Sequence, residues 1–246
     1  MKKYELTKIG EFHTNHNEDY LISNEIGFNK IMIAVMDGCS MGIDSHFAST
    51  LIGKILKKVS TEIHYKEFAE KTENSIEQIL KEVTRSLFHK LKELKNELSL
   101  ERDELLSTMI LGIVDREEKV AEIITIGDGL IICDGVITEY EQDNKPDYLG
   151  YHLSGKFEDW YEKQNQRLRL SKIEDLSIST DGIFTFKKFD AEEYDQVTES
   201  EIIDYLLIDR QEKESKNMLL KKIIRIEKKW GLKPSDDLTI IRLMIE

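Results

Sequence analysis

A short apolar stretch that ends in an acidic residue constrains this chain of 246 residues more than any other feature. Residues 31–36 read IMIAVM, and five of these six side chains are large and apolar. The run is too short to cross a membrane and has the length of a buried strand. Asp37 and Gly38 follow at once. A carboxylate at the mouth of a buried strand is unfavourable unless a cation or a hydrogen-bond donor compensates it, which makes Asp37 a candidate site residue.

The same pattern, an apolar run next to Asp-Gly or Asp-Asp, recurs at Asp128, Asp181 and Asp236. Each of these aspartates stands where a predicted strand ends or begins, and Glu18 lies in the first polar turn. Any one of them could be an ordinary turn residue, because aspartate is common in turns. Together they form the kind of all-oxygen donor set that selects Mg²⁺ or Mn²⁺. Two such ions about 4 Å apart can activate a water for attack on phosphorus.

Asp134-Gly135 also follows an apolar run but is interpreted differently. It joins two short apolar strands, and Asp-Gly in that position is the strongest short signal for a β-hairpin. We therefore predict a turn there, and no metal ligand.

The composition indicates which partners the protein is not expected to bind and in which compartment it is expected to work. The formal net charge of −13 argues against nucleic acid or an anionic membrane as a partner. The first ten residues are polar and contain no signal-type apolar core. Cys39 and Cys133 are far apart and form no CxxC motif, which fits a reduced, cytoplasmic compartment. No linker interrupts the chain, so a single domain over residues 1–246 is expected.

The order of the predicted elements favours an antiparallel α+β layered fold over a doubly wound parallel sheet, because strands cluster in meanders instead of alternating with helices. Amphipathic patterns predict helices after Gly42, over about 74–98 and over about 214–230, and the basic residues of 221–229 are interpreted as the solvated face of the last helix. Strands are expected at 4–12, 19–26, 31–37, 107–115, 119–126, 130–133, 136–140, 176–180 and 238–245. Residues 141–172 are polar and irregular, and we predict an insertion with one short helix near 157–166.

Six short blocks occur in one particular order along the chain. They are NED (17–19), VMDG (35–38), a Ser-Thr strand (107–108), IGDG (126–129), STDG (179–182) and SDDLT (235–239). In order and separation they resemble the signature blocks of the metal-dependent type-2C serine/threonine protein phosphatases, and the resemblance runs from Gly10 to Leu243. It implies a four-layer α-β-β-α sandwich of two antiparallel sheets flanked by helices. It also implies that residues 141–172 are a flap-like insertion.

The resemblance implies a centre of two Mn²⁺ or Mg²⁺ ions at one end of the sandwich. Asp37 would bridge the two ions, and Asp181 and Asp236 would complete the catalytic core. The remaining ligands would be the Gly38 carbonyl, Glu18 through water for the second ion, and Asp128 for a weaker third ion. Asp19 would be a structural or water-binding partner, and Asp237 stands where the family has asparagine.

One departure concerns the phosphate. The family carries an arginine a few residues before the NED block, and this chain reads His13-Thr14-Asn15-His16 instead. Since His13 and His16 flank the position of that arginine, we predict them as substrate-binding residues. The Asp residues of the metal centre are kept while the phosphate ligand is not.

The sequence therefore predicts a cytoplasmic enzyme that hydrolyses phosphoserine and phosphothreonine in proteins with a metal-activated water. The alternative is a catalytically weak or inactive relative that acts as a phosphoprotein-binding regulatory module. The missing arginine favours that alternative, and the retained aspartates oppose it. A haloacid-dehalogenase-like phosphatase would need a second aspartate two positions after the first, and Cys39 stands there. The oligomeric state is not predicted.

Overall fold

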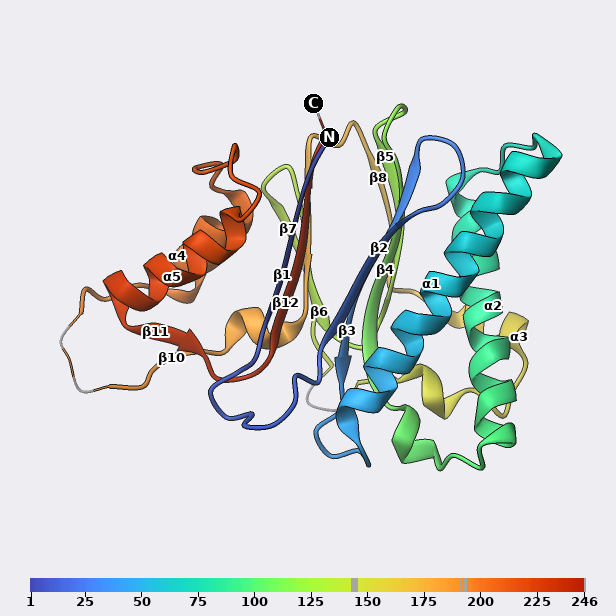
Figure 1. Cartoon of the computed structure of the whole chain (residues 1–246), viewed down its shortest axis with the longest axis horizontal. Helices are drawn as coiled ribbons and strands as arrows, with labels where there is room; N and C mark the ends of the chain where they lie inside the picture. The colour runs from blue at the N-terminus through green and yellow to red at the C-terminus, as the bar shows by residue number, and fades with distance from the viewer. Residues whose placement is uncertain (143–145, 191, 193, 246) are drawn as a thin grey trace.

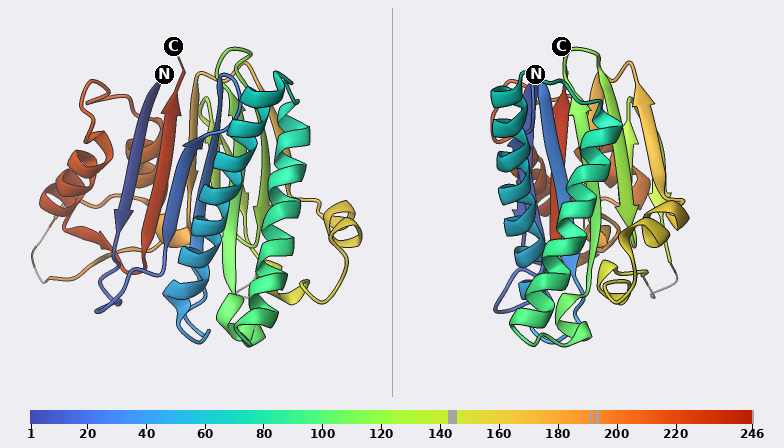
Figure 2. Two further views of the ribbon diagram at one scale, coloured as in Figure 1. Left: turned by 45° about the vertical axis from the view of Figure 1, so that its right-hand side comes forward. Right: turned by 90° about the vertical axis from the view of Figure 1, so that its right-hand side faces the viewer.

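Two five-stranded antiparallel sheets packed face to face form the centre of the protein, and helices cover the outer face of each (Figure 1). The computed structural model describes residues 1–142, 146–190, 192 and 194–245. The predicted α+β sandwich with its four layers is confirmed, and the rotated views of Figure 2 show the helices of the two outer layers on opposite sides of the sheets.

The first sheet has the strand order β2-β3-β4-β5-β8. Its central strand β3 carries the apolar run of residues 31–36, and all six side chains of that run are buried. They are continuously apolar because one face of the strand meets the other sheet and the other face meets helices. The strands are β2 (Tyr20–Glu25), β3 (Lys30–Gly38), β4 (Ser107–Asp115), β5 (Val120–Ile126) and β8 (Arg167–Ser171).

The second sheet has the order β1-β12-β9-β6-β7. The turn between β6 and β7 is Asp134-Gly135, where both residues have positive φ, so the predicted hairpin is confirmed. The strands are β1 (Lys2–Lys8), β6 (Gly129–Cys133), β7 (Val136–Tyr140), β9 (Asp175–Ser179) and β12 (Leu238–Met244).

Three apolar clusters fill the spaces between the four layers. The inner one lies between the sheets and contains side chains such as Val35, Ile110 and Ile178. A second fills the space between the first sheet and the helices α1 (Ser45–Glu70), α2 (Ile76–Glu97) and α3 (Phe157–Lys163). Helix α2 begins with the reciprocal capping pair Ser75 and Gln78.

The third cluster packs α5 (Met218–Trp230) and the short segment of α4 (Glu199–Ile203) with the π-helical turn Asp204–Ile208 against the second sheet. The α4 segment and the small ribbon of β10 (Phe186–Lys188) and β11 (Leu232–Pro234) were not predicted from the sequence. They are too short to show a helical or strand period.

Two fully buried cations fasten this helical layer to the second sheet. Arg242 on β12 pairs with Asp175 through two hydrogen bonds of 2.9 and 2.8 Å, and it donates the others to the carbonyls of Leu206, Ile208 and Asp209. All its N–H donors are thus satisfied in the interior.

Lys222 on α5 is the second buried cation. It donates to the Tyr205 carbonyl at 2.6 Å and lies 3.0 Å from the Asp209 carboxylate. The interpretation of the basic 221–229 run as solvated was therefore wrong for Lys222. A helix pattern alone does not reveal that a neighbouring segment presents unpaired carbonyls to one of its lysines.

The segment 141–172 is more ordered than the sequence suggested. Helix α3 occupies the position of the predicted short helix, but β8 was not expected, and it pairs with β5 as the edge strand of the first sheet. Residues 143–145 lie outside the described part of the chain.

All the strands next to the candidate carboxylates end or begin at the same edge of the sandwich, opposite the two termini (Figure 1). Strands β3 and β9 run toward this edge, and β2 and β12 start from it. Within the part of the chain that the structure describes, no helix combines the length and apolar character needed to cross a lipid bilayer.

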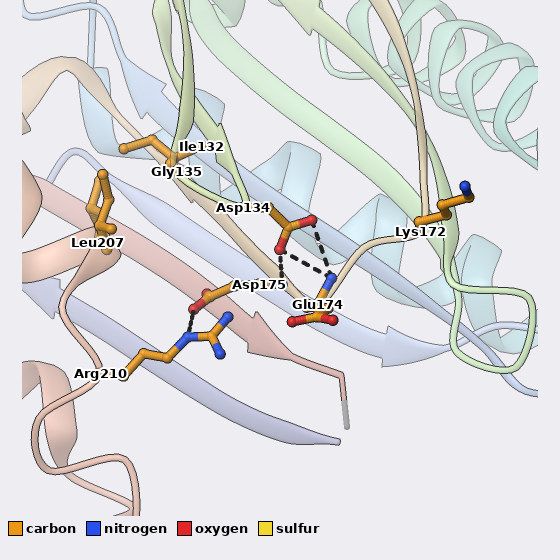
Figure 3. Close-up of a pocket in the computed structure, with 9 residues that line it drawn as sticks. Ile132, Asp134, Gly135, Lys172, Glu174, Asp175, Leu207 and Arg210 are labelled. Atoms are coloured by element: carbon orange, nitrogen blue, oxygen red, sulfur yellow. Dashed lines mark hydrogen bonds and ion pairs between the residues drawn. The ribbon is translucent and has the colours of Figure 1, made fainter.

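A cavity of about 460 Å³ lies at the opposite edge, near the start of β9 (Figure 3). The Asp134 carboxylate accepts hydrogen bonds from the backbone N–H groups of Glu174 and Asp175, and Arg210 donates to Asp175 at 3.0 Å. The carboxylates of Asp134 and Asp175 in its lining thus already have donors, and the cavity lies away from the predicted site.

The buried pair yields a stability prediction. Asp175→Ala should lower the free energy of unfolding by about 3–5 kcal/mol, because Arg242 would stay buried without its counter-charge. The control is Glu62→Ala, which removes an exposed ion pair with Lys58 and should change little. Urea denaturation followed by circular dichroism measures both. Equal losses in the two variants would show that the buried pair does not fasten the layers.

Candidate active site

Asp37 and Asp19 lie next to each other at the edge of the first sheet. Strand pairing matches Tyr20 with Met36, which places the residue before β2 beside the end of β3. Asp19 is buried, and the Thr180 hydroxyl donates to its Oδ2 at 2.8 Å. Its Oδ1 has no hydrogen-bond donor among the described residues. A buried carboxylate oxygen without a donor is unfavourable, so this position calls for a proton or a cation.

The electrostatic surroundings of Asp37 also favour a bound proton or cation. Burial, followed by the negative charges of Asp19, Asp181 and Asp236, raises the pKa of Asp37 well above its usual range. Burial also raises the pKa of Asp19 to about 7, although its hydrogen bonds, first that with Thr180, oppose the shift. Without a cation, burial and these neighbouring charges therefore favour the protonated form of the Asp37 carboxyl group.

Asp181 belongs to the second sheet and reaches the same place. It follows β9 and begins a 3₁₀ helix over Asp181–Phe184. Burial, followed by the charges of Asp128 and Asp236, raises its pKa to about 7, and the backbone N–H groups of Asp181 and Gly182 lower it. The two sheets thus bring carboxylates toward each other from opposite sides of the sandwich.

Asp128 lies in the crossover from β5 in the first sheet to β6 in the second. Gly127 and Gly129 on either side both have positive φ, and a Cβ at Gly127 would come within 2.9 Å of Thr108. Glycine at these two positions therefore allows the tight crossover. Burial raises the pKa of Asp128, with a further contribution from the Glu141 charge.

Asp236 and Asp237 precede β12, but their side chains have different partners. The Asp236 side chain is 44% exposed and lies among the carboxylates that act on Asp37. Asp237 is buried, and its two oxygens accept the backbone N–H groups of Gly10 and Glu18 at 2.7 and 2.5 Å. Asp237 thus holds the 10–18 loop in place instead of facing the cluster.

Glu18 is tied to the loop that follows β3. Its carboxylate accepts hydrogen bonds from the hydroxyls of Ser40 and Ser45, at 2.8 and 2.5 Å. Its carbonyl accepts the backbone N–H of Gly38 at 3.1 Å. A Cβ at Gly38 would come within 2.0 Å of the Ser45 carbonyl, so only glycine fits there.

The two histidines of the first turn occupy different positions. His13 Nδ1 lies 2.9 Å from Asp237 Oδ2, and its Nε2 lies 3.5 Å from Asp236 Oδ1. His16 is exposed and stacks on His46 with ring centroids 4.4 Å apart. His13 therefore lies beside the carboxylates, and His16 lies on the surface above helix α1.

The donor set suits a hard divalent cation. Asp37, Asp128, Asp181 and Asp236 offer only oxygen, and ion-binding oxygens of this kind select Mg²⁺ and Mn²⁺. Their charges act on one another, yet no three acidic, histidine or cysteine side chains of the described residues form a closed shell for an ion. The structure thus shows mutually repelling carboxylates that a cation would relieve, and not a completed shell.

Tyr148 is a neighbour of this cluster that the sequence did not indicate. Burial, followed by its contact with the Cys39 thiol and the charges of Asp37 and Asp128, raises the pKa of Tyr148. Its hydroxyl therefore stays protonated and available as a hydrogen-bond donor. No sequence signal identifies it, because Tyr148 reaches the site only through the fold of the 141–172 segment.

We compared the chain with known protein families, curated sequences and solved structures. The profile of the family described as protein phosphatase 2C matches residues 13–224. No curated protein sequence matches the chain.

Several solved structures share the fold. A variant of a bacterial serine phosphatase has 18% identity and a TM-score of 0.62, and the alignment covers 100% of this chain and 99% of that one. The serine/threonine phosphatase Stp1 from Staphylococcus aureus has 16% identity and a TM-score of 0.61, with coverages of 100% and 96%. RsbX in complex with magnesium has 15% identity and a TM-score of 0.58, with coverages of 99% and 94%. At these identities the likeness establishes the fold.

The repulsion among the carboxylates predicts a stability effect. Asp37→Asn should raise the melting temperature of the ion-free protein above pH 7, because it removes a charge that the folded state disfavours. The raised pKa of Asp37 means that this penalty is absent where Asp37 is protonated in both states, below about pH 4. The gain should therefore grow as the pH rises.

Differential scanning calorimetry in EDTA at several pH values between 4 and 8 measures this. The control is Asp134→Asn, since the Asp134 carboxylate caps a turn at the other edge. A gain for Asp37→Asn that stays constant with pH would contradict the electrostatic account.

Proposed function

The chain belongs to the protein phosphatase 2C family, and from that membership we propose that it hydrolyses phosphoserine and phosphothreonine in proteins with the help of Mn²⁺ or Mg²⁺. The observation that carries the proposal is the raised pKa of Asp37 beside Asp19, Asp181 and Asp236. A carboxylate cluster that disfavours its own charge binds divalent cations in exchange for protons.

In this proposal the acidic residues are ligands of three different ions. Asp37, Asp181 and Asp236 would hold two core ions together with the Gly38 carbonyl, and Glu18 would hold the second ion through water. Asp128 would hold a weaker third ion. When bound, the ions supply a water of lowered pKa as the nucleophile.

The rest of the chain keeps these ligands in position. Asp237 fixes the backbone of Glu18, and Asp19 lies beside Asp37 and is anchored by Thr180. His13 and His16 are the proposed phosphate-contacting residues of the first turn. Because His13 Nδ1 lies beside Asp237 and its Nε2 beside Asp236, a phosphate would compete with these two carboxylates for the imidazole N–H groups.

The partner is then a phosphorylated protein. Cys39 and Cys133 are both free thiols in the structure, which agrees with the proposal of a cytoplasmic location. The alternative of a phosphoprotein-binding module with little turnover is supported by the first turn, which reads His13-Thr14-Asn15-His16 and lacks the arginine of the family. The next two experiments separate these functions.

Loss of Asp37 tests the activity. With Mn²⁺ and an aryl phosphate, wild type should show turnover that EDTA abolishes. Asp37→Asn should lose more than the ~10–100-fold typical of residues outside the first ligand shell. Asp134→Asn is the control and should retain turnover. If the folded Asp37→Asn variant turned over like wild type, the hydrolase proposal would be wrong. A wild type that binds phosphopeptide without hydrolysing it would establish the binding module instead.

Asp128 separates the third ion from the core. Asp128→Ala should still bind two Mn²⁺ ions in a calorimetric titration, because Asp37, Asp181 and Asp236 remain. Turnover at saturating Mn²⁺ should fall about 10–100-fold. A variant that fails to fold would instead identify Asp128 as a residue of the crossover turn, since it lies between two glycines with positive φ.

A further inference from the structure

A groove opens beside the carboxylate cluster, on the side of the loop that follows β3. It has a volume of about 370 Å³, and its lining includes Cys39, Met41, Arg102, Leu106, Tyr148 and Tyr151. Cys39 directly follows Gly38, and the Tyr148 hydroxyl interacts with the charges of Asp37 and Asp128. The groove therefore begins at the proposed site of hydrolysis and leads away from it.

The walls of the groove are fixed to one another. The 39–43 loop is joined to residues 103–106 by two backbone hydrogen bonds, from Cys39 to Leu106 at 3.1 Å and from Ile43 to Asp103 at 3.2 Å. Gly150 lies so close to the 3₁₀ helix Arg102–Leu105 that a Cβ there would come within 2.6 Å of the Leu105 carbonyl. The groove is thus preformed, which lowers the entropic cost of binding.

The lining combines apolar surface with one ion pair, because Asp103 also lines the groove and its carboxylate lies 3.2 Å from Arg102 Nε. The Met41 side chain is 89% exposed on the rim, and the rings of Tyr148 and Tyr151 meet edge to face at 5.5 Å. The Arg102 guanidinium lies 5.2 Å from the centre of the Tyr151 ring, and the hydrogen bonds of the described residues engage only its Nε, with Asp103. Asp103 occupies the Nε side of this guanidinium, so the two terminal NH₂ groups are the ones that can pair with an anionic peptide whose apolar side chain covers the exposed rim.

We propose that this groove binds the phosphopeptide substrate: an apolar side chain next to the phosphorylated residue lies between Met41 and Tyr151, and Arg102 pairs with the negative charge of the peptide. The inference rests on the proposed hydrolysis at Asp37. It identifies Met41, Arg102 and Tyr151 as specificity residues for the peptide.

Two phosphoserine peptides of equal length, one with leucine and one with glycine next to the phosphoserine, test the proposal. Wild type should show kcat/KM about 5- to 10-fold higher for the leucine peptide, as expected for one buried apolar contact. Met41→Asp should remove this preference, and Arg102→Ala should lower kcat/KM for both peptides relative to the aryl phosphate. Matched controls are Phe68→Ala, which removes an exposed apolar side chain from α1, and Arg169→Ala, which removes an exposed arginine from β8.

Fluorescence anisotropy of the labelled peptides on Asp37→Asn gives a readout independent of turnover. The Asp37→Asn/Met41→Asp double variant should bind the leucine peptide no better than the glycine peptide. If wild type hydrolyses neither phosphate but the binding preference persists, the proposed function fails while the groove assignment holds. Equal kinetics and binding for both peptides in wild type would overturn the assignment. A groove filled by a second copy of the chain would also overturn it, and would appear as a dimer in sedimentation that Met41→Asp dissociates.

Discussion

The structure depends on one electrostatic constraint: carboxylates from two different sheets meet at one edge of a sandwich whose interior is apolar. Asp37 lies at the end of the buried central strand β3 of the first sheet, and Asp181 and Asp236 flank strands of the second. Burial, followed by their mutual repulsion, raises the pKa values of Asp37 and Asp181, so the folded protein disfavours their charges unless a proton or a cation compensates them. The fold tolerates this arrangement because the rest of the sandwich supplies the free energy of folding through three apolar clusters.

The backbone segments that carry these carboxylates also lie very close to one another. Backbone segments approach one another so closely that Gly10, Gly38 and Gly182 have no room for a Cβ. Asp237 satisfies two backbone N–H groups of the 10–18 loop, and Thr180 links Asp19 to β12 by accepting the Thr239 N–H. These contacts join the ends of the two sheets and so hold the carboxylates of both sheets in one place.

Much of this arrangement could be predicted from the sequence, because the strand-end aspartates stand next to apolar runs whose period is visible. The fold class, the family and the β6–β7 hairpin were confirmed. The pairing of Asp19 with Asp37 could not be predicted, because it depends on the register of β2 with β3. Strand β8 was missed although Arg-Leu-Arg-Leu alternates, since it lies in a segment interpreted as an irregular insertion. The burial of Lys222 and the approach of Tyr148 depend on contacts between distant segments, and no local pattern encodes them.

The account rests on the claim that this edge of the sandwich is a divalent-metal centre. The most direct measurement is anomalous diffraction at the manganese edge from crystals soaked in Mn²⁺. The account predicts two strong peaks, both within coordination distance of Asp37, with Asp181 and Asp236 around the first. Manganese peaks only at other surface carboxylates, with the Asp37 and Asp181 carboxyl groups unchanged at saturating Mn²⁺, would contradict it.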